Sequence, residues 1–414
     1  MISRTYFIVT SFLLFIFFTL SIIFIVLQSG LSIKEISLQN VKIKELYIKW
    51  NENIDVSAKE ILITKSIDDN TSKLDLNSII SYVGKISPLH SVFEKITLQK
   101  INYDGIDISL QYQKGSDGYL TASSSDFIFD SSITSYSNIF HMKINKYNDF
   151  QRDIKANGNI IFNTAVQNLT STIRINVHNE IILDILVHAN EDKLYYKVNS
   201  INDIPSIFYT MELLNLHKDL KYWAYKAIDF SSLEIHNAYG WIDFSNVANA
   251  YKNIYASATG KNLSYAYHKD LDAIHTKTTE LEFKNGVLYI YPKQATTYAS
   301  QLGQSWLKID FTTPQETLTL QLLFDGQLDK DTLGILETFK IKVPFLQNSG
   351  QTNVDLTLVI DLQTIDIDSQ GVFFTPTANF TYAGLDIDVV NTKIILDNYD
   401  IEIKNMIASY ENMI

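Results

Sequence analysis

The sequence contains no cysteine. This excludes disulfide bonds, thiolate metal sites and cysteine nucleophiles, and it also excludes a lipid anchor attached to an N-terminal cysteine. The absence does not define a redox compartment, because oxidising and reducing spaces both accommodate a cysteine-free chain.

Glycine and proline are scarce, at 15 and 6 of 414 residues. No stretch rich in proline, glycine or serine divides the chain, so nothing marks a flexible linker. We therefore expect an N-terminal segment, residues 1–28, followed by one extended architecture over residues 29–414.

Basic residues are fewer than acidic ones, 34 against 46, and the formal net charge is -12. Nucleic-acid binding needs the opposite sign of charge, so we expect no nucleic-acid partner. An acidic body is also repelled by anionic lipid head groups. Contact with a membrane therefore has to come from hydrophobic insertion.

The common motifs of catalytic and metal sites are missing. The eight histidines include no pair at helical i, i+4 spacing, and neither HExxH nor GxSxG occurs. Asp366 to Gly371 resembles the start of a calcium loop, but Thr377 stands where that loop needs a glutamate. We expect no enzyme: no catalytic residue, no metal and no cofactor. The alternative of an anchored glycan hydrolase requires two carboxylates paired in a cleft.

The longest apolar run is Tyr6 to Leu27, which contains no charged residue. At a rise of about 1.5 Å per residue it spans roughly 33 Å as a helix, enough for the core of a bilayer. A cleavable signal peptide is the alternative, but its apolar region is usually shorter. With Arg4 before the run, we expect a single-pass membrane anchor with a cytoplasmic N-terminus and the bulk of the chain outside the cytoplasm.

Short alternating phrases follow the anchor. Lys34–Leu38, Lys44–Ile48 and Lys59–Ile63 each begin with a Lys-Glu pair and continue with alternating apolar residues. Polar residues at 39–40 and 51–53 separate the phrases and predict turns. Because alternation of period two places one set of side chains on one face of a sheet, we expect a meander of strands.

The same alternation continues near the C-terminus. Apolar side chains recur on one face of the segments 307–311, 318–324, 354–362 and 385–389, with polar residues between them. This pattern is typical of antiparallel sheets with one apolar and one polar face. The residues that we expect to form one apolar surface are Leu307, Ile309, Phe311, Leu318, Leu320, Leu322, Phe324, Val354, Leu356, Leu358, Ile360 and Leu362.

Three helices are expected between the strands, near 75–87, 209–228 and 329–339. Each has an apolar stripe at helical spacing, and Asp75 and either Asp329 or Asp331 are placed to cap two of them. We expect each helix to be a lid or plug on a sheet edge. After Ile401 and Ile403 no protective element follows, so we expect either a further envelope protein at an open C-terminal edge or a shortened member of a longer family.

This combination resembles the AsmA-like envelope proteins. The resemblance rests on the single anchor, on the strands Ile33–Ile36 and Ile43–Leu46, and on the segments 283–286, 291–292, 305–311 and 351–356. It implies a mainly β fold: an elongated, antiparallel, taco-like β-groove with a few short helices. It also implies an anchor in the bacterial inner membrane, a location of the bulk of the chain in the periplasm, and phospholipid transport between the inner and outer membranes.

The physical chemistry of a fatty chain agrees with this expectation. Moving one acyl chain of sixteen carbons through water costs roughly 12 kcal/mol, at about 0.8 kcal/mol per methylene. A continuous apolar trough removes this cost without a catalytic residue. An ordinary β-sandwich also has one apolar face, however, and a scaffold for envelope or outer-membrane protein assembly that carries no lipid is the alternative function.

Overall fold

The computed structural model describes the chain in seven stretches. These are residues 22–64, 92–205, 228–266, 272–297, 300–338, 343–364 and 366–410. The chain divides into two compact units, each of which is described by itself. Unit 1 comprises residues 1–178 and 185–194, and unit 2 comprises residues 179–184 and 195–414.

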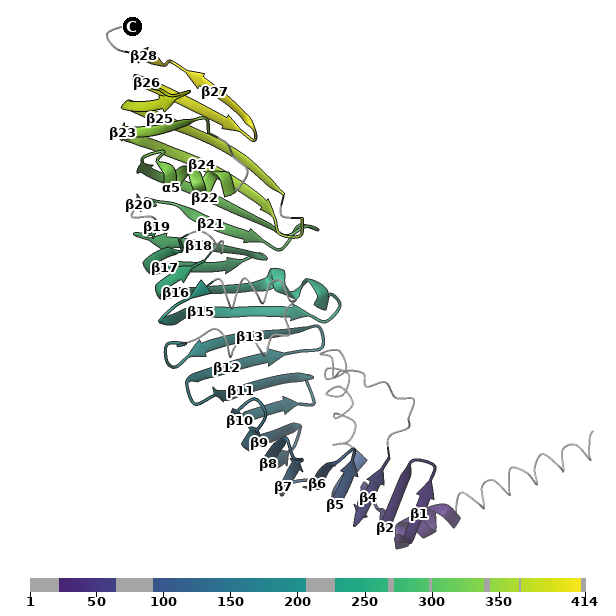
Figure 1. Ribbon diagram of the computed structural model, residues 1–414. Coiled ribbons are helices and arrows are strands. Elements are labelled where there is room, and N and C mark those ends of the chain that lie inside the picture. The colour runs from purple at the N-terminus through teal and green to yellow at the C-terminus, as the bar shows by residue number, and fades with distance from the viewer. Residues whose placement is uncertain are drawn as a thin grey trace, which may run out of the picture. The chain divides into compact units, whose positions relative to one another are not determined.

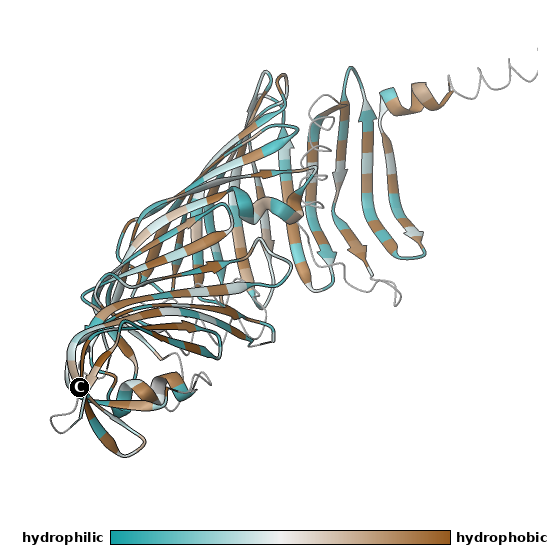
Figure 2. Ribbon diagram, turned by 90° about the horizontal axis from the view of Figure 1, so that it is seen from above, coloured by the Kyte–Doolittle hydropathy of each residue, from teal (hydrophilic) through white to brown (hydrophobic). Residues whose placement is uncertain are grey.

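The described chain is mainly β, and its strands form a mixed, mostly antiparallel sheet. The prediction of a mainly β protein is therefore confirmed. Hydrophobic and hydrophilic residues alternate along many strands (Figure 2). Such alternation gives a sheet one apolar and one polar face.

Four short strands open unit 1 where the three similar phrases lie. β1 (Leu31–Leu38) and β2 (Val41–Trp50) form an antiparallel hairpin around the predicted turn at 39–40. β4 (Glu60–Ile63) pairs antiparallel with the first half of β2, and β3 (Ile54–Ala58) with the second half. All three phrases are thus strands of one sheet.

Parallel pairing at β5 (Phe93–Tyr103) corrects the prediction of a purely antiparallel sheet. Val56 of β3 pairs with Ile96, and Ile61 of β4 pairs with Ile101, both in parallel register. Parallel strands need a crossover connection of about a dozen residues or more. The interval from Ile63 to Phe93 is long enough to supply it.

From β5 to β11 each strand pairs antiparallel with the next (Figure 1). Asp104 and Gly105 join β5 to β6 with positive φ angles of 49° and 80°, as a type I′ hairpin turn requires. The strands after β5 are β6 (Ile106–Gln113), β7 (Asp117–Ser123), β8 (Phe127–Tyr136), β9 (Ile139–Asp149), β10 (Ile154–Asn163) and β11 (Asn168–Val177).

The division between the units runs through β12 (Ile181–Ala189) and β13 (Lys193–Ser200). In unit 2, β15 to β18 pair in order, followed by β21 and β22, all antiparallel. The elements up to β22 are β14 (Ile228–Asp229), β15 (Ser232–Asp243), the 3-10 helix η1 (Val247–Asn253), β16 (Ile254–Tyr265), β17 (Ile274–Lys284), β18 (Val287–Lys293), β19 (Thr296–Thr297), β20 (Ser300–Gln301), β21 (Trp306–Asp310) and β22 (Thr317–Gly326).

The last part of unit 2 contains a long strand with two partners on one edge. The first half of β25 pairs with β24 and the second half with β23, while β24 also pairs with β22. Pro376, which has no N–H to donate, lies in β25 between the two pairing segments. The elements are α5 (Lys330–Thr338), β23 (Phe345–Gly350), β24 (Thr352–Asp361), β25 (Ile367–Tyr382), β26 (Leu385–Asp397), β27 (Asp400–Lys404) and β28 (Ile407–Ser409).

The helix predicted near 329–339 is confirmed as α5. The carboxylate of Asp329 accepts a hydrogen bond of 2.9 Å from the backbone N–H of Thr332, so Asp329 caps the helix. The helix predicted near 75–87 lies outside the described residues. So does the one near 209–228, apart from Ile228, which begins strand β14 instead.

The predicted membrane span lies mostly outside the described residues. Residues 1–21 are not among them, and residues 22–29 are helical. Within the described stretches, no helix combines the length and the apolar character that a membrane crossing needs.

Candidate functional site

The residues predicted to line an apolar surface lie on neighbouring strands of unit 2. Leu307 of β21 pairs with Leu320 of β22, which pairs in turn with Leu358 of β24. Directly paired residues of a sheet point to the same face. Further rows of the same kind are Ile309–Leu318–Ile360, Leu322–Leu356 and Phe324–Val354.

Two predicted residues lie just beyond the ends of their strands. Phe311 follows β21, and its ring centroid lies 6.2 Å from that of Phe283 on β17. Leu362 follows β24 and donates its backbone N–H to the carbonyl oxygen of Glu316. The structure therefore keeps both beside the predicted rows.

The same apolar face extends to strands that the sequence analysis did not select. Leu281 of β17 pairs with Ile290 of β18, which pairs with Leu307. In the next row Phe283 pairs with Leu288, which pairs with Ile309. Leu281 and Phe283, like Leu288 and Ile290, show period-two alternation, a signal that could have identified them. We call the side of β17 to β26 that carries these rows the apolar face of unit 2.

One end of this face is covered by protein. Leu328 precedes α5 and Leu336 belongs to it. Both pack in a buried cluster with Leu356 and Leu358 of β24. Leu356 and Leu358 are only 2% and 1% exposed. Of the predicted residues, Leu318 and Val354 are buried as well. We call Leu328, Leu333 and Leu336 the α5 cover.

The other end of the face is less covered. On β17, β18 and β21, Leu281, Phe283, Leu288, Leu307 and Ile309 are half-buried, and Ile290 is the one buried member of the two rows on these three strands. An apolar surface that protein leaves accessible to this extent can accept apolar atoms from a ligand.

Unit 1 has a comparable apolar row of its own. Ile43 of β2 pairs with Ile61 of β4, which pairs with Ile101 of β5, and the row continues through Ile108 to Ala122. All five side chains are half-buried rather than buried. Each unit therefore carries an apolar sheet face with accessible side chains.

The opposite face of unit 2 is polar and hydrogen-bonded across strands. Gln321 donates to the Asp355 carboxylate at 2.6 Å, and Thr357 donates to the side-chain oxygen of Gln321 at 2.7 Å. Further along, Asn379 donates to Asp388 at 2.8 Å. The polar residues predicted to oppose the apolar ones thus form a ladder on their own face.

Charged groups lie at the strand ends and on the polar face. The hydroxyl and the backbone N–H of Thr312 hold the pKa of Asp310 below its usual range. In unit 1 a hydrogen bond from Lys44 keeps the pKa of the Glu60 carboxyl below its usual range. The Thr312–Asp310 and Lys44–Glu60 pairs therefore position a turn and a hairpin, and they place no charge in the apolar rows.

Within the described stretches, no group of three or more His, Cys, Asp or Glu residues is placed so that it could hold a metal ion. The apolar faces themselves offer no nucleophile or acid–base pair in their rows. What they can do chemically is to remove hydrocarbon from water.

The chain was compared with known proteins. No protein-family model matches it, and no curated protein or solved structure matches it either. Function is therefore inferred from the residues and their arrangement.

Proposed function

We propose that this protein binds the acyl chains of phospholipid along its apolar sheet faces and carries the lipid through the periplasm between the inner and outer membranes. The observation that carries the proposal is the set of apolar rows, continuous across neighbouring strands, most of whose members away from the α5 cover are half-buried. The resemblance of the sequence to the AsmA-like envelope proteins supports it. No catalytic residue, metal or cofactor is required.

The lipid-contact surface that we propose is narrower than the full set of predicted residues. It consists of the accessible rows around Leu307 and Ile309 in unit 2 and around Ile61 in unit 1. Leu356 and Leu358 already have apolar neighbours in the α5 cover, so a lipid would meet them only if that cover moved aside.

Removal of the acyl chain from water supplies the free energy of binding. Each methylene removed from water contributes about 0.8 kcal/mol. A row of half-buried side chains that contacts ten methylenes would therefore stabilise a bound chain by several kcal/mol, roughly 8 kcal/mol before the cost of ordering the chain. This is enough to hold a fatty tail out of water without making its release prohibitively slow.

A second function, a scaffold for envelope or outer-membrane protein assembly that carries no lipid, is favoured by one observation. The cluster under the α5 cover is packed like an ordinary protein core, with Leu328, Leu356 and Leu358 each no more than 2% exposed. A face sealed in this way along its whole length would leave no room for hydrocarbon.

Site-specific photo-crosslinking separates the two functions. A photoreactive amino acid at Leu307 should capture phospholipid in membranes, whereas the same residue at Lys308, its neighbour on the opposite face, should not. Mass spectrometry of the gently purified full chain should then find bound phospholipid. Equal labelling at the two positions, or a lipid-free protein, would contradict the carrier and favour the scaffold.

A further inference from the structure

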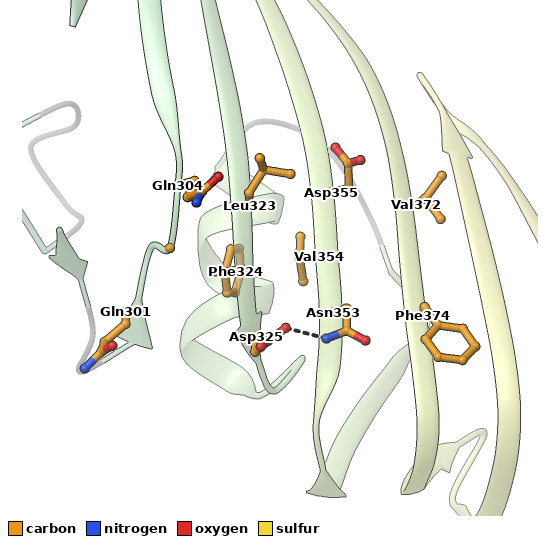
Figure 3. Close-up of a pocket in the computed structure, with 11 residues that line it drawn as sticks. Gln301, Gln304, Leu323, Phe324, Asp325, Asn353, Val354, Asp355, Val372 and Phe374 are labelled. Atoms are coloured by element: carbon orange, nitrogen blue, oxygen red, sulfur yellow. Dashed lines mark hydrogen bonds between the residues drawn. The ribbon is translucent and has the colours of Figure 1, made fainter. Parts of the chain in front are cut away.

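A pocket lies on the polar face of unit 2, and Phe324 and Val354 of the apolar rows also belong to its lining. It has a volume of about 870 Å³, within the range of small-ligand sites of roughly 300–1,000 Å³. Its lining comes from β22, β24 and β25, from Gln301 of β20 and from residues that follow β20 (Figure 3). The sequence analysis did not identify it.

Three apolar side chains interrupt the polar face in this pocket. Leu323 of β22 and Val372 and Phe374 of β25 line it, all at positions where alternation calls for polar residues. Phe374 is 39% exposed, a large fraction for a phenylalanine. In Figure 3 its ring lies at the side of the pocket beyond Asn353. The pocket thus offers an aromatic side chain that a ligand can reach.

Planar polar groups surround these apolar side chains. Asn353 donates a hydrogen bond to the Asp325 carboxylate, and the Asp355 carboxylate accepts one from Gln321 at 2.6 Å. Gln301 and Gln304 complete the polar lining. Each carboxylate has further lone pairs with which to accept a bond from a ligand.

The charge of the lining restricts the ligand. The lining contains two carboxylates and no Lys, Arg or His, although Lys393 of β26 pairs with Phe374 at its edge. The two carboxylates disfavour phosphate, carboxylate and nucleic-acid ligands. Each carboxylate keeps lone pairs that a hydroxyl group can reach, and the aromatic ring of Phe374 beside them can pack against a flat C–H face. A ligand with a flat C–H face and a rim of hydroxyls matches both parts of the lining.

From this match we infer that the pocket binds a neutral oligosaccharide. One sugar ring packs its C–H face on Phe374, and its hydroxyls donate to Asp325 and Asp355. This site is independent of lipid binding on the apolar face, so the protein would hold a glycan on one side of the sheet and hydrocarbon on the other.

Saturation-transfer NMR tests the inference with three probes, maltotriose, cellotriose and chitotriose. The full chain is kept in a detergent without sugar groups, so that no detergent head group competes. We expect saturation transfer to the ring C–H protons of at least one probe. Phe374→Ala should weaken its binding about two- to tenfold, the range expected for loss of one aromatic contact, and Asp355→Ala should weaken it as well.

The matched control is Tyr382→Ala, which removes an exposed aromatic of the same strand outside the pocket and should leave binding unchanged. Absence of transfer to all three sugars would overturn the inference. So would equal effects of the Phe374 and Tyr382 substitutions, or displacement of the sugar by trilysine, which would indicate a site for cationic peptides instead.

Discussion

Gln347 and Leu328 are joined by hydrogen bonds in both directions. The Leu328 N–H donates to the side-chain oxygen of Gln347 at 2.9 Å, and the Gln347 N–H donates to the Leu328 carbonyl at 3.0 Å. The hydroxyl of Thr352 also donates to the Gln347 side-chain oxygen, at 2.9 Å, and lies 2.8 Å from the hydroxyl of Thr375. This buried polar chain ties the start of the α5 cover to three strands.

Replacing Gln347 by alanine should loosen the α5 cover. The substitution leaves the buried Leu328 N–H and Thr352 hydroxyl without this acceptor, at a cost of about 1–3 kcal/mol for each group left unsatisfied. Amide hydrogen exchange at residues 328–336 should become faster. Gln370→Ala, at an exposed position of β25, is the control and should change little. Unchanged exchange in the Gln347 variant would show that the cover is held by its apolar contacts alone.

Leucines of the same apolar face should differ in their contribution to stability. Leu358→Ala should destabilise unit 2 by about 2–5 kcal/mol, because it leaves a cavity in the buried cluster. Leu307→Ala, at a half-buried position, should cost only about 1 kcal/mol. Native-state hydrogen exchange of β24 and β21 measures both losses. Equal losses would mean that the face is packed uniformly and would argue against an accessible lipid surface.

Asp310 should contribute to stability in a pH-dependent way. Because Thr312 lowers the pKa of Asp310 in the folded state, the stabilisation is complete above the unfolded pKa of about 3.9 and is lost as the pH falls through the folded pKa. Thr312→Val removes the hydroxyl bond and should raise the pKa of Asp310, as a carboxyl-carbon NMR titration would show. Thr313→Val should not, and a pKa unaffected by either change would contradict the assignment.

The apolar run Tyr6–Leu27 should hold the protein in the membrane. Full-length protein should stay in the membrane fraction after extraction at alkaline pH, and a variant that lacks residues 1–28 should be released. The physical reason is that an uncharged span of this length partitions into the bilayer core. Leu13→Arg combined with Phe17→Arg should weaken retention without shortening the chain. Retention of the deletion variant would place membrane attachment in the β-structure.

Sequence patterns predicted the strands well because burial on one face of a sheet acts on every second residue. Val354 to Ile360 alternate with polar residues and form β24, and the Lys-Glu phrases form strands of unit 1. Asp329 or Asp331 was predicted to cap the helix α5, because a cap acts within one turn, and the structure shows that Asp329 does so.

Features set by distant residues were not predictable in the same way. An apolar face looks the same in the sequence whether protein or ligand covers it. The sequence therefore predicted a helix near 329–339 as a lid or plug, but it did not predict that this helix would bury Leu356 and Leu358. The parallel partner of β5 depends on residues some forty positions earlier. The runs Leu322–Phe324 and Val372–Phe374 did break the alternation, and they could have pointed to the pocket on the polar face.

The order of strand pairing affects how the chain can fold while it is being synthesised on the ribosome. Between β5 and β11 every new strand finds its partner in the hairpin just made, so structure can accumulate while synthesis continues. β23 has to wait, because its partner is the second half of β25, which emerges about thirty residues later. In that interval the leucines of β22 and β24 lack the packing that β25 completes. We therefore expect chaperones to bind this apolar surface before β25 has been synthesised.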